Sequence, residues 1–386
     1  KRGDVRQDRG RKISAVGNST FRKVLVVTQF AFSIGLIIGT MVINRQIQFI
    51  RSQDLGYNKD HIFTIQMHGM EAHYEAIKAE LLHRPEIKGI TSGNNSIVSS
   101  GSSTGDTDWD GKPTDQSLII NQFYIDKDYV NLFDIKFAAG TGFTGSKSDT
   151  AHFILNETAI KLTGLKNPIG KRFKLHNVDG TIVGVAKDFH FASLKQTIAP
   201  AIFAYSPASW QMYVKTTGKD APAAIKAVQK YWQLYNSNFP FEYTFLDTQY
   251  NDLYKSEQQS GTLFSMFAGI AIFISCLGLF GLATYTAQIK VKEIGIRKVL
   301  GAGVIDITTM LSKNFLLLVL IAIAIASPVT WYAMNKWLQG YAYRAEFQWW
   351  IIALAGLSAI LIALLTISFQ SVKAALANPV KSLRNE

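Results

Sequence analysis

The chain has 386 residues, a formal net charge of +12 and a single cysteine, Cys276, so an intrachain disulfide is excluded. A basic composition can indicate a nucleic-acid-binding protein, but such proteins carry their basic residues on a folded domain. The long central region of this chain is almost neutral, and this distribution argues against nucleic-acid binding.

Four long runs of the sequence are apolar and carry almost no charge: 24–43, 262–287, 315–334 and 349–369. A helix needs about 20 apolar residues to cross a hydrocarbon layer about 30 Å thick. Each run therefore predicts one transmembrane helix. Residues 44–261, between the first two runs, predict a large domain outside the bilayer.

The basic residues predict the orientation of these spans. Residues 1–23 form a basic leader with eight Lys/Arg and two Asp, a net of +6. The loop 288–314 has a net charge of +3, and the tail 370–386 has a net charge of +2. Cytoplasmic segments of membrane proteins are enriched in Lys and Arg. We therefore expect both termini and the 288–314 loop in the cytoplasm, and the large domain and the short loop 335–348 outside.

The large domain has the pattern of a mixed α/β fold. Two strand–helix–strand units lie near its opposite ends, at 61–67, 71–83 and 87–91 and at 211–216, 222–235 and 241–246. We expect these units to pair in one sheet, because the chain must enter and leave the domain beside neighbouring membrane helices. The residues between them, about 94–200, predict a β-rich insertion.

The segments that flank the domain have helical character. The first helix is predicted to continue to Leu55, where Gly56 is a plausible stop, and 248–260 is polar but compatible with a helix. These segments predict a two-helix stalk. A pair of flexible linkers is the alternative interpretation.

The cytoplasmic loop contains the most specific local motif, VKEIGIRKVLGAG at 291–303. Glu293 and Arg297 stand four residues apart, the favourable order for an ion pair on a helix. Apolar or small residues follow helical spacing on another face: Ile296, Val299, Leu300, Gly303, Val304 and Ile307. The pattern predicts a short amphipathic helix at the membrane surface. A basic helix resting on anionic lipid would have the same composition.

The sequence contains no convincing catalytic or cofactor motif. GLKNPIGKR at 164–172 departs from the phosphate-binding loop in spacing and in its last residue, and GTGFTG at 140–145 is followed by no helical pattern. His68, Glu71, His73 and Glu75 lack the HExxH order of a zinc site and are interpreted as residues of a surface helix. We expect no catalytic residue, metal or cofactor in this chain.

Polar residues are few inside the predicted spans, chiefly Gln29, Ser275 and Ser327, and none at the core of a span is ionisable, which argues against a proton-coupled carrier. Small residues at Gly35 and Gly39 suit close helix packing, either within the chain or at a dimer face. Pro328 is predicted to kink the third span.

EIGIRKVLGA resembles the signature loop of the FtsX/MacB-type permeases, the membrane subunits of a class of ABC transporters. The order of one span, a large domain and three spans is also similar to that family. Three further stretches resemble its members: NPIGKRFKL at 167–175, IVGVAKDFHFASLKQTIAP at 182–200 and the ending ANPVKSLRNE. The resemblance covers essentially the whole chain.

This resemblance implies a MacB-like periplasmic core domain on a four-helix membrane unit, in a bacterial inner membrane. It implies that a separate ATP-binding subunit, which holds ATP and Mg, contacts the motif positions Glu293, Gly295, Arg297, Lys298 and Gly301. It also implies a second permease module, as a homodimer or a tandem half, and admits a periplasmic adaptor or outer-membrane protein. The basic leader resembles the junction inside tandem permeases, so we expect the chain to be the C-terminal module of a longer protein.

The function that follows is mechanotransmission. ATP-driven closure of the partner subunit would move the large domain, for efflux or extraction of a peptide, drug, amphiphile or lipoprotein. The alternative is an FtsX-like regulator of a periplasmic cell-wall hydrolase, which transports nothing. A membrane-anchored sensor is a third possibility, but one span would suffice for it.

Overall fold

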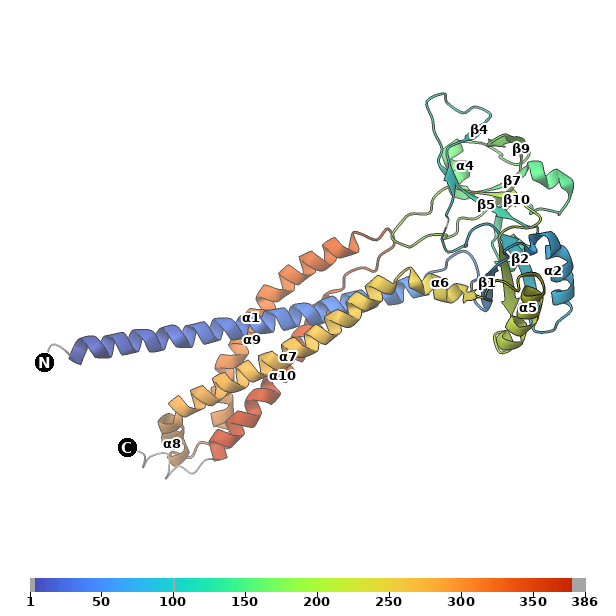
Figure 1. Ribbon diagram of the computed structural model, residues 1–386. Coiled ribbons are helices and arrows are strands. Elements are labelled where there is room, and N and C mark those ends of the chain that lie inside the picture. The colour runs from blue at the N-terminus through green and yellow to red at the C-terminus, as the bar shows by residue number, and fades with distance from the viewer. Residues whose placement is uncertain (1–3, 100, 377–386) are drawn as a thin grey trace. The chain divides into compact units, whose positions relative to one another are not determined.

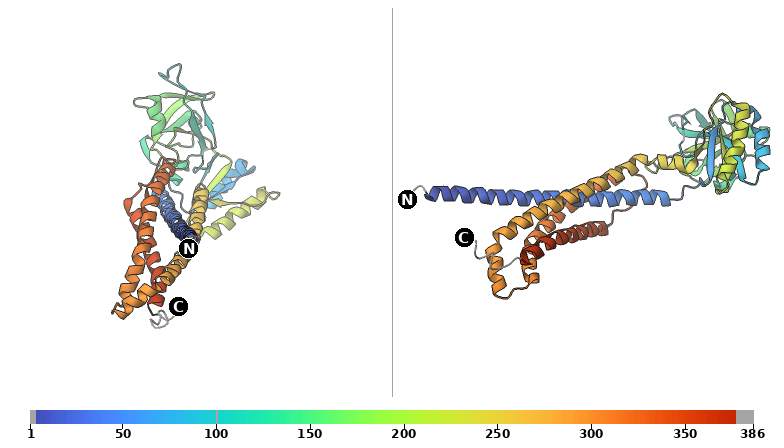
Figure 2. Two further views of the ribbon diagram at one scale, coloured as in Figure 1. Left: turned by 90° about the vertical axis from the view of Figure 1, so that its left-hand side faces the viewer. Right: turned by 60° about the horizontal axis from the view of Figure 1, so that its bottom comes forward.

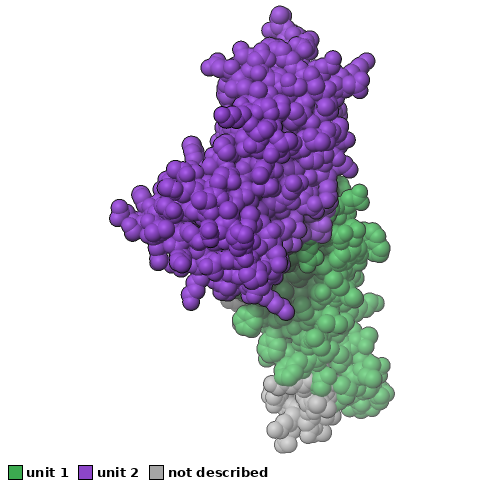
Figure 3. Space-filling view, turned by 90° about the vertical axis from the view of Figure 1, so that its right-hand side faces the viewer, with its two compact units in different colours: residues 1–49, 256–340, 344–386 green, residues 50–255, 341–343 purple. Residues whose placement is uncertain are grey.

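The computed structural model describes residues 4–99 and 101–376, and the chain divides into two compact units. Residues 1–49, 256–340 and 344–386 belong to the first, the helical unit. Residues 50–255 and 341–343 form the second, the α/β domain (Figure 3). The expected tail beyond residue 376 and the first three residues of the basic leader lie outside the described residues.

Five helices build the helical unit: α1 (Asp4–Ser52), α7 (Lys255–Ile289), α8 (Val291–Val299), α9 (Val304–Leu338) and α10 (Trp349–Leu376) (Figure 1). All except α8 are long and apolar enough to cross a membrane, which confirms the four predicted spans. At 1.5 Å per residue, the 35 residues of α7 or α9 extend for about 52 Å, well beyond a hydrocarbon core of about 30 Å.

A seam of buried side chains holds these helices together. On α1 it follows helical spacing through Val26, Phe30, Ile34, Ile38 and Val42. On α10 it consists mainly of small residues four positions apart, Ile351, Ala355, Ala359, Ala363 and Ile367. Small residues allow the backbones of membrane helices to approach closely. Figure 2 shows the resulting close pairing of α9 with α10.

The α/β domain is organised around one twelve-stranded mixed sheet. Its strands are β1 (Ile62–Gln66), β2 (Ile87–Gly93), β3 (Ser103–Thr104), β4 (Thr107–Trp109), β5 (Ile120–Ile125), β6 (Phe137–Gly140), β7 (His152–Asn156), β8 (Arg172–Leu175), β9 (Val178–Ala186), β10 (Ala201–Tyr205), β11 (Gln211–Thr216) and β12 (Thr244–Phe245). The main order is β12-β1-β11-β2-β5-β10-β7-β9-β8-β4, with β3 beside β5 and β6 beside β9.

The helices of this domain are short. They are η1 (Met70–His73), α2 (Tyr74–Leu82), α3 (Tyr129–Leu132), η2 (Lys147–Ala151), α4 (Glu157–Thr163), α5 (Ala221–Tyr235) and α6 (Leu246–Asp252). α2 and α5 close one core over β1, β2 and β11. A second core, around Trp109, Phe153 and Phe173, fills the inserted lobe. These two cores correspond to the predicted outer units and the predicted β-rich insertion.

The sheet order explains how the ends of the domain meet. β1 pairs antiparallel with both β11 and β12, so the first and last strands of the domain are direct neighbours. This is the pairing predicted from the two strand–helix–strand units. The last predicted strand, 241–246, is shorter than expected, because only Thr244 and Phe245 pair with β1.

The stalk boundaries also differ from the prediction. α1 ends at Ser52 rather than Leu55, and the chain turns at Gly56, whose φ of 76° favours glycine. The backbone N–H of Gly56 donates to the Asp54 carboxylate at 2.9 Å and fixes this turn. Before the second span, α6 ends at Asp252 and α7 begins at Lys255, so a break interrupts the predicted helix 248–260.

Candidate functional site

The motif found in the sequence forms α8 and the tight turn that follows it. The N–H of Ala302 donates to the carbonyl of Arg297 at 2.9 Å, and the N–H of Gly301 donates to the carbonyl of Lys298 at 3.1 Å. With Gly301 at a φ of 94°, this is the Schellman arrangement that ends a helix at glycine. The N–H of Gly303 then donates to the Asp306 carboxylate at 2.9 Å, so α9 begins at once.

One face of α8 is fixed against α9. Ile294 is buried in a small cluster with Ile307 and Leu311 of α9, and Met310 packs against it. Gly295 is also buried on this side. Only Lys290 separates α8 from α7, and its N–H still donates to the carbonyl of Thr286 at 3.1 Å. α8 is therefore tied closely to two of the long helices.

The opposite face is apolar and exposed. Ile296, Val299 and Leu300 are 55%, 70% and 81% exposed, and Ile305 at the start of α9 is 80% exposed. These four residues are called the α8 knob below. The predicted single stripe from Ile296 to Ile307 is wrong, because the left-handed Gly301 ends the helix. Ile307 faces the interior, whereas the rest of the apolar set faces outward.

The predicted ion pair on α8 is present. Arg297 Nη2 lies 2.9 Å from Glu293 Oε1, and Lys290 Nζ lies 3.4 Å from Glu293 Oε2. Exposed pairs of this kind contribute about 0–1 kcal/mol, so their main effect here is to fix the direction of the side chains. With Lys298 beside them, the charged border of the knob is mostly basic.

The five motif positions thus occupy different places in this site. Glu293 and Arg297 form the surface pair, Gly295 is buried, Lys298 is half-buried and Gly301 makes the turn. The predicted apolar stripe did not include Ile305, the fourth member of the knob. Its signal was the Gly301-Ala302-Gly303 run, which indicates a reversal rather than a continuing helix.

The small residues of the first span pack inside the chain. A Cβ added at Gly35 would lie 3.1 Å from Oγ1 of Thr330, and one added at Gly39 would lie 3.1 Å from the ring of Phe264 and 3.8 Å from Met334. Both glycines therefore face α9 and α7. Pro328 lies inside α9 and leaves the carbonyl of Ala324 without its usual intrahelical donor.

Polar groups inside the spans bond mainly to their own helices or to one another. The hydroxyls of Ser33 and Ser275 are 3.1 Å apart and link α1 to α7. Ser327 Oγ donates to the carbonyl of Ile323 at 2.7 Å. The described span residues form no chain of ionisable groups that could relay a proton.

The glycine-rich run at 140–145 is a turn organised by one carboxylate. Asp149 is 2% exposed and accepts the N–H groups of Thr144 and Gly145, each at 2.7 Å. Because Asp149 fills this cradle, the run offers no phosphate site. His68 stacks on Phe239 and His73 on Tyr235, and the described residues contain no metal-ligating cluster.

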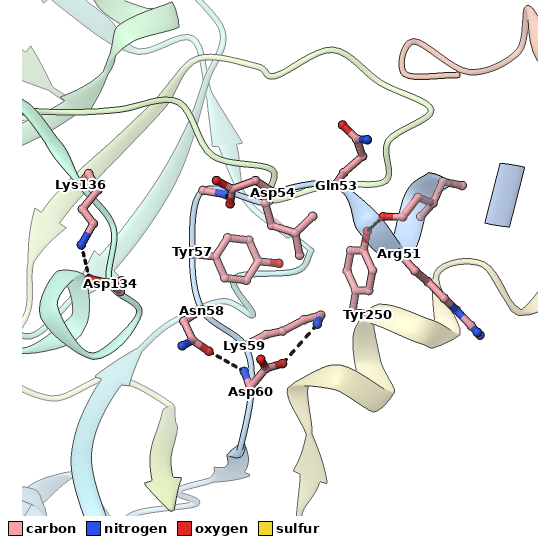
Figure 4. Close-up of a pocket in the computed structure, with 13 residues that line it drawn as sticks. Arg51, Gln53, Asp54, Tyr57, Asn58, Lys59, Asp60, Asp134, Lys136 and Tyr250 are labelled. Carbon is pink, nitrogen blue, oxygen red and sulfur yellow. Dashed lines mark hydrogen bonds and ion pairs between the residues drawn. The ribbon is translucent and has the colours of Figure 1, made fainter. Parts of the chain in front are cut away.

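A polar cavity of about 360 Å³ lies where the chain enters the α/β domain (Figure 4). Lys59 pairs with Asp60 at 3.4 Å, and Lys136 pairs with Asp134 at 2.5 Å. On its floor, burial raises the pKa of the Tyr57 hydroxyl, so Tyr57 is neutral and cannot act as a base. The charges on the rim largely satisfy one another and form no nucleophile–base pair.

Two parts of the chain match known protein families. A family model described as MacB-like periplasmic core domain matches residues 24–231, more than half of the chain. A second model, FtsX-like permease C-terminal, matches residues 265–379. No curated protein matches the chain.

Two solved structures are similar to parts of the chain. The periplasmic region of MacB from Actinobacillus actinomycetemcomitans has 14% identity and a TM-score of 0.38, over 53% of this chain and 98% of that one. The extracellular domain of the noncanonic ABC-type transporter YknZ from Gram-positive bacteria has 14% identity and a TM-score of 0.35, over 47% of this chain and 97% of that one.

Proposed function

The chain belongs to the FtsX/MacB-type family of ABC transporter permeases, and on that premise we propose that it is a mechanical transmission driven by a separate ATPase. A subunit that binds ATP and Mg docks on α8 from the cytoplasm. Its closure displaces α8 and, through the long helices, moves the α/β domain on the other side of the membrane.

The observation that carries this proposal is the α8 knob. Lipid can cover apolar side chains on the spanning parts of the long helices, but the knob lies on the nine-residue α8, the residue that follows it and the first turn of α9, outside the apolar runs. Exposed apolar clusters with a polar border are typical of protein interaction sites. The basic border favours a partner groove with acidic edges.

The connections of α8 suit the transmission of force. α7 is one continuous helix of 35 residues, and a single residue joins it to α8. The buried Ile294–Ile307–Leu311 cluster also ties α8 to α9. A packed apolar contact resists deformation, so a displacement of α8 is passed to both helices.

Efflux or extraction is the preferred use of this motion, with a peptide, drug, amphiphile or lipoprotein as cargo. Regulation of a periplasmic cell-wall hydrolase is the alternative. The large α/β domain, with its complete inserted lobe around Trp109 and Phe173, favours work on a bound substrate. ATPase activity that rises on addition of a substrate to the reconstituted complex would favour transport.

The test is a charge reversal on α8. The intact protein is purified from membranes, its stoichiometric ATPase partner is identified, and Glu293→Lys with Arg297→Glu is compared with the native chain. The variant keeps opposite charges four residues apart, so α8 should still form. We expect normal membrane insertion with loss of the coupling between ATP hydrolysis and activity.

Reversal of an exposed pair elsewhere serves as the matched control. Lys136→Asp with Asp134→Lys exchanges two charges that are 66% and 61% exposed on the α/β domain, and coupling should be unchanged. Unchanged coupling in the α8 variant, or purification without any ATPase, would overturn the proposed role.

A further inference from the structure

One short segment of the α/β domain, His190–Lys195, is hydrogen-bonded to each of the three places where the chain enters or leaves that domain. The N–H of His190 donates to the carbonyl of Leu55, which follows α1, at 2.8 Å. The N–H of Leu194 donates to the hydroxyl of Tyr254, which precedes α7, at 2.8 Å. At the third of these places, the α9–α10 loop, the N–H of Tyr343 donates to the carbonyl of Leu194 at 3.1 Å.

Side chains reinforce the contact with the α9–α10 loop. The rings of His190 and Tyr343 meet edge to face with their centroids 4.7 Å apart. Tyr341 is only 3% exposed, and Lys195 Nζ lies 5.5 Å from the centre of its ring. The N–H of Ala342 also donates to the carbonyl of Lys195 at 3.2 Å. Residues 341–343 are therefore an integral part of the α/β domain.

The same segment forms one wall of a cavity of about 250 Å³. The opposite walls come from Asn121 in β5, from Val98 and Ser99 between β2 and β3, and from Leu253, which follows α6. The residues that line it are Val98, Ser99, Asn121, His190, Phe191, Ala192, Ser193, Gln196, Thr197, Ile198, Ala199 and Leu253. Sites for drug-sized ligands span about 300–1,000 Å³, so this cavity suits a smaller group.

The lining is uncharged. Apolar side chains such as Phe191 and Leu253 alternate with hydroxyls and amides such as Thr197 and Gln196, and Asp, Glu, Lys and Arg are absent from these lining residues. Burial lowers the pKa of His190, an effect that outweighs the nearby Asp188 and Asp54, so the imidazole is neutral at pH 7. A charged group entering this cavity would lose its hydration without gaining an ionic partner.

The wall also has main-chain groups available for pairing. Thr197 and Ile198 lie in the irregular segment between β9 and β10, and among the described residues neither has a hydrogen-bonding partner for its backbone. Thr197 is exposed and Ile198 is half-buried, so both can be reached. An extended peptide recognises such a segment by main-chain hydrogen bonds and places alternate side chains in adjacent pockets.

We propose that this cavity binds one uncharged residue of an extended peptide, whose main chain pairs with Thr197 and Ile198. A peptide bound there also stabilises the three hydrogen bonds that join His190–Lys195 to Leu55, Tyr254 and Tyr343. The inference rests on the proposed function, because it supplies a substrate class and a site for the permease. Occupancy would then change how firmly the α1 exit, the α7 entry and the α9–α10 loop are held.

The experiment uses the intact chain in lipid nanodiscs and the photoreactive tripeptide acetyl-Ala-photoleucine-Ala-amide. After illumination, the labelled residues are identified by mass spectrometry. We expect labels on 98–99, 191–199 and Leu253. Excess acetyl-Ala-Leu-Ala-amide should reduce them at least tenfold, while acetyl-Ala-Asp-Ala-amide should have little effect, because a tenfold change corresponds to about 1.4 kcal/mol and burial of a carboxylate costs more.

Ala192→Phe should fill the cavity and abolish labelling. Ala138→Phe places the same side chain on the exposed surface of β6 and should leave labelling intact. If Ala192→Phe does not fold, the competition between the neutral and the acidic tripeptides in the native chain still tests whether the cavity binds an uncharged residue. Labelling outside the cavity, equal competition by the acidic peptide, or competition by octyl glucoside alone would overturn the peptide site.

Hydrogen exchange on the same sample tests the coupling. The tripeptide should slow exchange at the N–H groups of His190, Leu194 and Tyr343, which make the three crossing contacts. Labelled cavities with unchanged exchange would refute the coupling. These assays need no ATPase, so their failure is distinct from failure of the α8 charge reversal.

Discussion

The two units of this protein place the same kinds of side chain in opposite environments. In the α/β domain, Phe63, Ile65 and Val214 are at most 2% exposed. In the helical unit, Leu357, Leu361 and Leu365 form a row along α10 with exposures of 62%, 58% and 67%. Leaving such residues in water would cost about 1.5–3 kcal/mol each. The difference shows that one surface is suited to water and the other to lipid.

The α8 knob belongs to neither pattern. It is as exposed as the row on α10, yet it lies on a helix with Glu293 and Arg297 on its surface, outside the apolar runs. Water makes such exposure unfavourable, and lipid covers it only at the membrane surface. A protein partner is the third environment. Four comparisons test how these environments differ, and the one between Leu300 and Leu320 separates a protein partner from lipid.

The largest effect is expected inside the α/β domain. The Asp126 carboxylate accepts from the Tyr74 hydroxyl at 2.6 Å and from Lys78 Nζ at 2.7 Å, and it also bonds to the Thr91 hydroxyl. Removing one partner of a buried pair costs about 3–5 kcal/mol. We expect Asp126→Ala to lower the free energy of unfolding by this amount, measured by pulse proteolysis in urea.

The control for Asp126→Ala is Lys136→Ala, which removes the exposed partner of Asp134. It should leave the unfolding midpoint nearly unchanged. Equal losses in the two variants would show that burial is not what makes the Asp126 cluster important.

A smaller effect is expected in the seam of the helical unit. Gly39→Leu would place a side chain against Phe264 and Met334, and overpacking costs about 1–3 kcal/mol. Thermal stability of the purified protein should fall. Gly281→Leu is the control, because nothing lies within 4 Å of a Cβ at that position. Loss of dimers with unchanged thermal stability would instead assign Gly39 to a dimer face.

The third comparison places the same change on the knob and on a spanning helix. Leu300→Gln should weaken ATPase binding by about tenfold, or about 1.4 kcal/mol, while membrane insertion is unchanged. Leu320→Gln, at a 50% exposed position inside the apolar run 315–334, should reduce insertion without affecting ATPase affinity. Binding assays on purified protein measure the first effect and membrane fractionation the second. If Leu300→Gln removes the contact of α8 with the lipid surface of vesicles and leaves ATPase binding normal, α8 is instead a lipid-bound helix.

The smallest effect depends on pH. Burial would raise the pKa of Asp149, but hydrogen bonds from His152, Gly145 and Thr144 outweigh it and lower the pKa. The charged carboxylate thus stabilises the fold above the unfolded pKa of about 3.9, and this contribution is lost as pH falls through the folded pKa. Asp149→Asn should cost about 1 kcal/mol at pH 7 and progressively less below about pH 4. A stability difference independent of pH would contradict this assignment.

Sequence periodicity was sufficient to predict the main helices and strands. Each span is a long unbroken apolar run, and each strand–helix–strand unit contains a clear change of period, so β11 begins and ends at the predicted residues Gln211 and Thr216. The pairing of β1 with β11 followed from the need to bring both ends of the domain together.

Contacts distant in sequence could not be predicted. Nothing in the sequence around Tyr343 indicates that its N–H bonds to Leu194, because that contact depends on the tertiary path of both segments. The α8 knob was predicted in part, since Ile296, Val299 and Leu300 have helical spacing. Its true shape depends on the left-handed turn at Gly301, which places Ile305 with the knob and Ile307 in the interior.

The most direct test asks whether the α8 knob and the α/β domain lie in different compartments. With Cys276→Ala as background, Val299→Cys and Ile119→Cys introduce single thiols at positions that are 70% and 65% exposed. In intact cells whose outer envelope is permeabilised, a membrane-impermeant maleimide should label residue 119 and not residue 299. Inverted membrane vesicles should give the reverse pattern. Labelling of both positions from the same side would contradict a transmission across the membrane.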